Sequence, residues 1–310
     1  MFTLLAAIVV ANPLSDSLRR SDSAVVFGPR ARVQVPIRDT AKLQSTTEGY
    51  RNEFHQRLAV IEKEVPLSYN ETVQSFINIY LGRKDQMGKM LGLSKYYFPI
   101  FEKALKEKGI PEEVKYLSVV ESALNPHAVS RVGATGPWQF MFSTAKAFGL
   151  TIDNYVDERK DPIAASYAAA NYFRDAYNEF GDWLLALAAY NCGKGNVNRA
   201  IKLAGGVNDY WAIWEYLPKE TRNYVPAFIA TTYVMNYYRE HNIEPQPTGL
   251  AIYTDTVAVN KFVSLASISR AAKLNLKELA LLNPSYKKQI VNGTVEAPRR
   301  LIIPQIDRNS

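Results

Sequence analysis

The sequence predicts a mainly α-helical protein that ends in a small module of mixed strands and helices. Apolar residues recur at helical spacing through most of residues 50–240. Residues 241–250 then combine prolines with a glycine, a composition typical of a linker between folded parts. After this linker the chain becomes rich in β-branched residues, which favour strands. We therefore expect one large helical domain and one small C-terminal module.

Length and composition suit a folded globular chain. The 310 residues are 47% hydrophobic and 22% charged, unlike a disordered sequence. The net charge of +7 suits an acidic polymer, which could be nucleic acid, an anionic membrane surface or an anionic cell wall. The lysines and arginines are scattered and form no dense stripe. We therefore predict no nucleic-acid partner.

Cysteine and histidine usage argues against several classes of site. Cys192 is the single cysteine, so no intramolecular disulfide can form. The three histidines lie far apart in the sequence and show no zinc-ligand spacing. Neither a phosphate-binding GxxxxGK[ST] pattern nor a GxSxG pattern occurs. The sequence therefore predicts no metal site and no cofactor.

The N-terminal residues resemble a secretory signal. Residues 1–11 form an apolar run that is too short to span a membrane and ends in small residues suited to cleavage. A basic stretch before the run is missing, because Arg19 and Arg20 lie after it. We expect a signal peptide over residues 1–11 and a polar linker or arm over residues 12–49. The protein would then act in the periplasm or cell envelope without a tight membrane anchor.

Several helices of the large domain begin with clear signals. Pro111 stands in the first turn of a helix and is followed by two glutamates that suit the helix dipole. Asp161 is the expected N-cap of a helix that starts at Pro162 and continues into an alanine-rich run. Further helices are expected over residues 183–190 and 225–239.

Glu121 is the candidate catalytic residue. On a helical period it shares a face with Val114 and Leu117, and Pro126 must end this helix near Asn125. A carboxyl group half-buried at a helix end has a raised pKa and can hold a proton near neutral pH, as a general acid requires. The alternative is a solvated glutamate at a frayed helix end.

Three later segments place glycine or proline beside amides and aromatic rings at helix ends. Together with Glu121-Ser122 they give four ordered motifs, which continue with Gly136–Phe140, Ala189–Gly193 and Asn223-Tyr224-Val225-Pro226. Through these motifs the region from about Tyr80 to Tyr237 resembles the lytic transglycosylases of bacterial cell-wall turnover, a goose-lysozyme-like family. It is most similar to their membrane-bound D type, in which such a domain precedes LysM modules.

The resemblance implies a lysozyme-like helical domain that acts on the glycan strands of peptidoglycan. In this family one glutamate protonates the β-1,4 bond between N-acetylmuramic acid and N-acetylglucosamine. The resulting carboxylate then takes a proton from the sugar's own 6-hydroxyl, which attacks the anomeric carbon and leaves a 1,6-anhydro ring. Glu121 would play both parts, as acid and then as base.

The same motifs suggest the residues that bind substrate. The amide of Gln139 can hydrogen-bond a sugar's acetamido group or Glu121, and Trp138 and Phe140 flank it as an apolar wall. Asn191 could orient a substrate acetamide, and Tyr224 matches the family tyrosine whose hydroxyl reaches the catalytic carboxylate. The complete expected set is Ser122, Trp138, Gln139, Phe140, Tyr190, Asn191 and Tyr224.

Residues 251–304 resemble a LysM module with a βααβ order. A strand is expected over residues 253–259, two short helices follow, and a last strand closes the module. The usual Gly-Asp-Thr-Leu turn is replaced by residues 260–263. The module is therefore expected either to bind glycan or to be a purely structural appendage.

Two other functions stay open. A hydrolytic, lysozyme-type muramidase would need a second carboxylate. The candidates are Asp153, Asp157, Glu158 and Asp161, although their setting indicates a solvated loop and a helix cap. A non-enzymatic peptidoglycan-binding protein is supported only by the LysM-like tail. No protein partner is predicted.

Overall fold

The computed structural model describes residues 53–305. The expected signal peptide (residues 1–11) and polar arm (residues 12–49) lie outside the described residues. Within the described part the chain is mainly helical and ends in a small module of strands and helices, which confirms the predicted fold class. None of the helices in this part is long and apolar enough to cross a membrane. We call residues 53–240 the helical domain and residues 251–305 the module.

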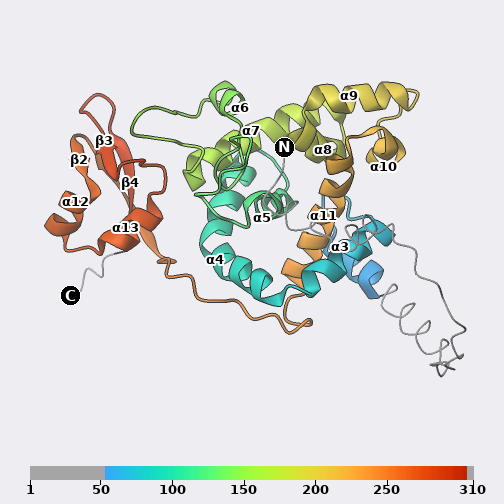
Figure 1. The fold of residues 1–310 in the computed structure, drawn as a ribbon, viewed down its shortest axis with the longest axis horizontal. Helices are drawn as coiled ribbons and strands as arrows, with labels where there is room; N and C mark the ends of the chain where they lie inside the picture. Colours follow the sequence, from blue (N-terminus) through green and yellow to red (C-terminus); the bar gives the residue numbers. More distant parts are fainter. Residues whose placement is uncertain (1–52, 306–310) are drawn as a thin grey trace, which may run out of the picture.

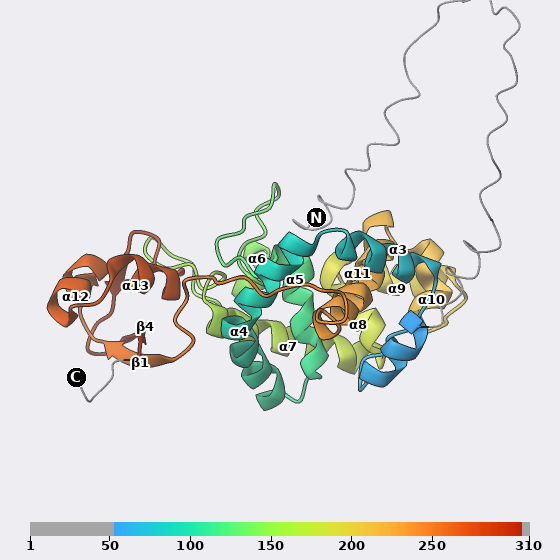
Figure 2. The ribbon, with the colours of Figure 1, turned by 90° about the horizontal axis from the view of Figure 1, so that it is seen from below.

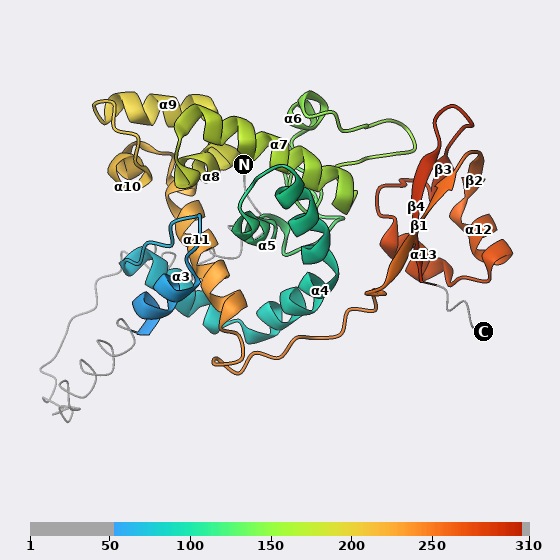
Figure 3. The same cartoon turned by 180° about the vertical axis from the view of Figure 1, so that it is seen from behind.

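The helical domain is built around the short helix α5 (Leu117–Ser122), which lies at its centre in Figures 1 and 3. The other elements are α3 (Glu71–Leu81), α4 (Lys84–Glu107), the 3-10 helix η1 (Glu112–Tyr116), α6 (Phe142–Ala147), α7 (Pro162–Phe180), α8 (Trp183–Cys192), α9 (Lys194–Leu203), α10 (Tyr210–Ile213), the 3-10 helix η2 (Trp214–Tyr216) and α11 (Lys219–Asn236). Helix α7 packs between α4 and α8, whereas α11 contacts α3, α5 and α8.

Helix α8 is buried on every side. All its residues from Trp183 to Asn191 are buried, and the helix has no polar face. A helix that is apolar all round belongs in a protein core. The alanines of α8 and of the facing α7 leave room for the two backbones to approach. This packing holds the C-terminal end of α8 in place.

The helix signals read from the sequence give a mixed result. Asp161 caps α7, since its carboxylate accepts from the backbone N–H groups of Ile163 and Ala164, as predicted. Pro111, however, precedes a 3-10 helix, so the single helix predicted through Glu121 is divided into η1 and α5. Helix α5 ends at Ser122, earlier than the predicted end near Asn125, because Ala123 and Leu124 adopt left-handed backbone angles.

The module contains one more pair of strands than the sequence predicted. Strand β1 (Thr254–Val259) pairs antiparallel with β4 (Arg299–Pro304), and between them lie α12 (Leu265–Ala272) and α13 (Leu276–Leu282). The additional pair is β2 (Phe262–Ser264) with β3 (Ile290–Asn292), also antiparallel. These strands have only three residues each, too short to give a clear alternating pattern.

The proline-containing linker is bound along α4. Figure 3 shows residues 241–250 passing from the end of α11 below α4 toward the module. The backbone N–H of Gln246 donates to the carbonyl oxygen of Gly88 (N···O 2.9 Å). A Cβ atom at Gly92 would lie 1.8 Å from the carbonyl oxygen of Gln246, so only glycine admits this close approach.

The module also docks on the loop before α7, which extends toward it in Figures 1 and 2. Val156 forms an isolated antiparallel bridge with Tyr286, and its side chain is buried in the core of the module. The N–H of Asp157 donates to the carbonyl oxygen of Ser285 (N···O 2.9 Å).

Residues of the module are in turn buried in the helical domain. Leu282 and Ile302 of the module are buried in the core of the helical domain. Arg300 donates to both carboxylate oxygens of Asp161, each at 2.9 Å. The two parts therefore share side chains across their boundary, and their relative arrangement is held by more than the linker.

Candidate active site

Glu121 is completely buried on α5, more deeply than the half-buried position predicted from the sequence. Burial raises the pKa of its carboxyl group to about 8, because a charge is poorly solvated there. The nearby Glu220 carboxylate raises this pKa further, whereas a hydrogen bond from Tyr224 lowers it. Glu121 therefore holds a proton at neutral pH.

Tyr224 controls one of the two oxygens of this carboxyl group. It lies on α11, and its hydroxyl donates to Oε1 of Glu121. Burial and the Glu121 charge raise the pKa of Tyr224 well above its usual value, so the hydroxyl remains a neutral donor. Among residues 53–305, Oε2 of Glu121 has no hydrogen-bond partner. The proton is therefore best placed on Oε2, the oxygen that is still free to donate.

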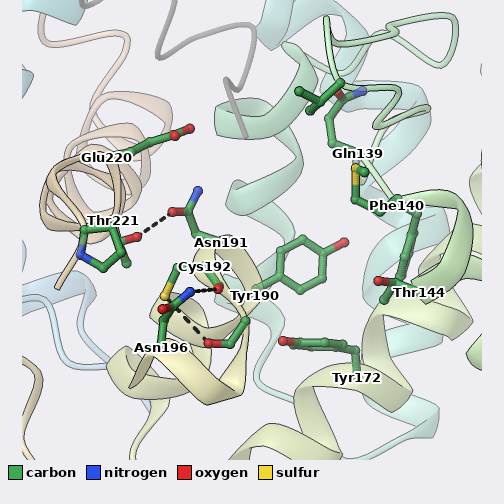
Figure 4. Close-up of a pocket in the computed structure, with 14 residues that line it drawn as sticks. Gln139, Phe140, Thr144, Tyr172, Tyr190, Asn191, Cys192, Asn196, Glu220 and Thr221 are labelled. Carbon is green, nitrogen blue, oxygen red and sulfur yellow. Dashed lines mark hydrogen bonds between the residues drawn. The ribbon is translucent and has the colours of Figure 1, made fainter. Parts of the chain in front are cut away.

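Figure 4 shows the residues that line an open pocket of about 550 Å³. Its walls come from the loop after α5, the C-terminal end of α8 and the N-terminal end of α11. Glu121 is not itself on the wall. Tyr190 and Glu220 do line the pocket. The charge of Glu220 raises the pKa of Glu121, and the charge of Glu121 raises the pKa of Tyr190. Glu121 is therefore within electrostatic range of the pocket wall.

Asn191 presents a donor to this pocket in a fixed orientation. The Thr221 hydroxyl donates to Oδ1 of Asn191 (2.8 Å), and both side chains are buried. Within the described residues, Nδ2 of Asn191 has no partner, and Figure 4 shows it turned away from Thr221. Thr221 was missed in the sequence, because nothing local links it to a residue on α8. Because Thr221 bonds the oxygen of the Asn191 amide, the nitrogen of this amide is left as the donor toward the pocket.

We expect Thr221→Val to lower kcat/KM for the glycan cleavage expected from the sequence by about 5- to 10-fold, the effect of losing one hydrogen bond of roughly 1 kcal/mol. Valine has nearly the same shape but cannot hold the Asn191 amide in one orientation. Steady-state kinetics and a thermal melt check this result. Thr221→Ser keeps the hydroxyl and should retain activity. Equal kinetics for the valine variant and the wild type would show that the orientation of Asn191 does not matter.

Gln139 presents an acceptor on the opposite side of the pocket. Its Nε2 donates to the carbonyl oxygens of Ala128 (3.2 Å) and Gly136 (2.8 Å). Its Oε1 has no partner within residues 53–305, and Gln139 lines the pocket. The side chain does not bond Glu121, so of the two partners considered from the sequence only a substrate group remains.

Phe140 and Tyr190 form a rigid aromatic wall. Their rings meet edge to face with centroids 5.9 Å apart, and the Tyr190 ring stacks on Phe173 at 4.8 Å. The Tyr190 hydroxyl donates to the carbonyl oxygen of Trp138 (2.7 Å). Both predicted residues therefore line the pocket, as an aromatic surface on which an apolar sugar face can pack.

The predictions for Trp138 and Ser122 need correction, because both side chains are completely buried away from the pocket wall. Trp138 donates from Nε1 to the hydroxyl of Ser166 (2.8 Å). Ser122 donates to the carbonyl oxygen of Pro137 (2.9 Å). The hydrogen bonds of both side chains help to fix the loop that carries Gln139. Tyr224 does not line the pocket either, and its hydroxyl donates a hydrogen bond to Glu121.

Glu220, in the first turn of α11, is the carboxylate that lines the pocket. The sequence analysis did not single out Glu220 as a candidate. The four carboxylates considered there, Asp153, Asp157, Glu158 and Asp161, lie at the docking contact with the module. Asp157 is not solvated as predicted: it is 4% exposed and bonds Arg159 at 2.8 and 2.9 Å. Across residues 53–305, no group of three His, Cys, Asp or Glu side chains could hold a metal ion.

Two families of known proteins match the chain. The family described as Transglycosylase SLT domain matches residues 98–212, which include α5, the loop with Gln139 and α8. The family described as Lytic transglycosylase MltD, LysM-like domain matches residues 253–309. Residues 98–212 are thus similar to SLT transglycosylase domains, and residues 253–309 to the LysM-like domain of MltD. The resemblance read from the four motifs and from the C-terminal module is confirmed.

Individual relatives agree with these domains. Membrane-bound lytic murein transglycosylase D of Escherichia coli (strain K12) is 28% identical over 248 residues, which cover 79% of this chain and 54% of that protein. The soluble lytic murein transglycosylase of the same strain is 31% identical over 149 residues, or 46% of this chain and 23% of that protein. The chain spans about half the length of the first curated relatives it matches.

Among solved structures, the 70 kDa soluble lytic transglycosylase from Escherichia coli matches with a TM-score of 0.40 and 24% identity. The match covers 66% of this chain and 35% of that one.

Proposed function

We propose that this protein is a peptidoglycan lytic transglycosylase that cleaves the β-1,4 bond between N-acetylmuramic acid and N-acetylglucosamine without consuming water. The observation that carries the proposal is the state of Glu121. Its buried carboxyl group has a pKa of about 8, one oxygen bonded to Tyr224 and the other oxygen unpartnered beside the pocket. A pKa near the working pH is what acid catalysis requires.

The first step would be proton transfer to the leaving group. Glu121 donates its proton from Oε2 to the glycosidic oxygen, and the bond between this oxygen and the anomeric carbon of the muramic acid breaks. Positive charge develops on the sugar ring while Glu121 becomes a carboxylate. The Tyr224 hydroxyl, which donates to Oε1, stabilises this carboxylate as it forms.

The second step would return the proton. The 6-hydroxyl of the muramic acid attacks its own anomeric carbon and gives its proton to the Glu121 carboxylate. A 1,6-anhydro ring forms, the leaving sugar keeps the first proton, and Glu121 is protonated again for the next cycle. One carboxylate is enough, because the nucleophile is tethered to the reacting carbon.

Two amides in the pocket match the acetamido groups of the substrate. An acetamido group offers one N–H donor and one C=O acceptor. The pocket offers the complementary pair, with Oε1 of Gln139 as acceptor and Nδ2 of Asn191 as donor, each without a protein partner within residues 53–305. We assign these atoms to an acetamido group, and the rings of Phe140 and Tyr190 to the adjacent sugar face.

Glu220 favours one alternative, a hydrolytic muramidase. Its carboxylate lines the pocket and acts electrostatically on Glu121, as a second catalytic carboxylate in a hydrolase would. In this alternative Glu220 would activate water or attack the sugar. We favour the lyase because the chain matches the SLT transglycosylase domain. The proposed place of action is the periplasm or cell envelope, with peptidoglycan strands as the partner.

The proposal is tested by incubating the purified protein with purified sacculi. We expect soluble muropeptides to be released and mass spectrometry to find anhydro-muramyl ends on them. A sample of the same protein denatured by heat is the control. Binding to sacculi with no release of fragments would mean that the protein is a non-enzymatic peptidoglycan-binding protein.

A further inference from the structure

A second groove, of about 610 Å³, lies between the helical domain and the module. The helical domain contributes His127 and Lys160 to its lining, and the module contributes Lys277 and Lys287. No aspartate or glutamate is among its lining residues. The rest of the lining is largely apolar and comes mainly from α13 and the residues that follow it, with Leu276 as one example. The groove therefore combines a basic rim with an apolar floor.

The docking of the module holds the two sides of this groove together. Val156 is buried in the core of the module, and Arg300 bonds both oxygens of Asp161. Lys160 directly precedes Asp161, while Tyr286 and Lys287 are among the module residues that contact this loop. The basic side chains of the two domains therefore face a common space in a fixed arrangement.

Lys160 and Lys277 are available to an anion, whereas the charge of Lys287 already lowers the pKa of the Asp153 and Asp157 carboxyl groups. Within residues 53–305, no carboxylate lies within ion-pair distance of Lys160, Lys277 or Lys287. Lys287 donates only to the backbone carbonyl of Asp153. Burial and the charge of Lys160 lower the pKa of His127, so the Lys160 ammonium acts on the same space as the imidazole. A concave site with one sign of charge attracts ligands of the opposite sign.

We propose that this groove binds the carboxylates of the peptide stems carried by peptidoglycan. This inference rests on the proposed function and names a feature of the substrate. The N-acetylated sugars of a glycan strand are uncharged once each lactyl group is linked to a stem, so the negative charges lie on the stem peptides. His127 of the groove precedes Ala128, whose carbonyl oxygen accepts a hydrogen bond (3.2 Å) from the side chain of Gln139, a residue of the pocket wall. In this proposal, a glycan strand bound in the pocket has its peptide stems bound by residues of both the helical domain and the module.

The test compares binding to two probes, intact sacculi and immobilised glycan strands from which an amidase has removed the stems. The full-length variant Lys160→Gln/Lys277→Gln should bind intact sacculi about 3- to 10-fold more weakly than the wild type, as expected for two partly exposed charge pairs. Its binding to stripped strands should not change. The loss should shrink as salt is raised. Binding is measured on ice, so that cleavage is slow.

Two matched variants separate charge in the groove from charge in general. Lys106→Gln/Lys273→Gln removes the same charge, one lysine from each domain, at exposed positions outside the groove. It should bind both probes like the wild type. Lys160→Arg/Lys277→Arg keeps the charge and should retain most of the binding.

A second measurement needs no variant. Free stem peptides should displace the wild-type protein from sacculi, whereas the same peptides with esterified carboxylates should not. Equal displacement by both peptides would overturn the proposal. So would equal binding of the glutamine variant and its control, an equal loss on stripped strands, or a loss seen only on anionic lipid vesicles. None of these readouts requires cleavage, so failure of this inference is distinguishable from failure of the proposed lyase activity.

Discussion

Replacing Glu121 with glutamine is expected to lower the rate of muropeptide release by at least about 10²-fold, the usual effect of removing a general acid. The amide neither donates a proton to the glycosidic oxygen nor accepts one from the 6-hydroxyl. Binding to sacculi should be retained, because Glu121 does not line the pocket. Release of soluble fragments measures the loss. Glu296→Gln, at an exposed position in the module, is the control and should be fully active.

The same substitution should stabilise the fold, and more so at higher pH. Folding raises the pKa of Glu121 from 4.5 to about 8, so the native state binds this proton more tightly than the unfolded state. The contribution of this proton is fully present below pH 4.5 and is lost as pH rises to about 8. Glutamine does not titrate. Since one pKa unit is worth about 1.4 kcal/mol, the variant should gain a few kcal/mol over the wild type across this range.

Thermal melts at pH 5 and pH 8 measure this difference. The variant should melt higher than the wild type at pH 8, with a smaller gap at pH 5. Near-normal fragment release by Glu121→Gln, together with identical melting at both pH values, would show that Glu121 is neither the catalytic acid nor a buried proton carrier.

Truncation after Gly249 is the second change with a large expected effect, since it should destabilise the remaining helical domain. Val156 would lose its apolar cover, Asp161 would lose Arg300, and the space filled by Leu282 and Ile302 would open to water. Burial of one such side chain contributes about 1.5–3 kcal/mol. We expect the melting temperature to fall by about 5–10 °C, as a loss of a few kcal/mol does in a domain of this size.

Circular dichroism melts of the full-length and truncated proteins check this expectation. Arg300→Gln removes only the ion pair with Asp161 and should cause a much smaller shift, because that contact is partly exposed. Identical melting of the two proteins would mean that the module is an independent unit tethered by residues 241–250. Weaker pelleting of the truncated protein with sacculi is expected in either case.

The features that could be predicted from the sequence are those encoded by local signals. Asp161-Pro162 specifies a helix start wherever the helix later packs. The contact between Tyr224 and Glu121, which are 103 residues apart, was predicted from the resemblance to a family, because no local pattern indicates it.

What the sequence could not reveal depends on packing between distant segments. Thr221 bonds Asn191, 30 residues away, and Glu220 reaches the pocket only because α11 packs against α5 and α8. Trp138 was placed at the substrate because an aromatic ring in a loop suits a sugar site and a core equally well. Its hydrogen bond to Ser166, 28 residues away, decides for the core.

The chemistry of the newly formed muramyl end tests the central claim most directly. Purified peptidoglycan is digested in isotopically labelled water, and the products are reduced with borohydride before mass spectrometry. If Glu121 works alone, the tethered 6-hydroxyl outcompetes water, with an effective molarity that can reach about 10⁵ M or more. The ends should then be 1,6-anhydro rings that resist reduction and carry no label. Mostly reducible ends that carry the label would contradict the account and identify a hydrolase, with Glu220 as its second carboxylate.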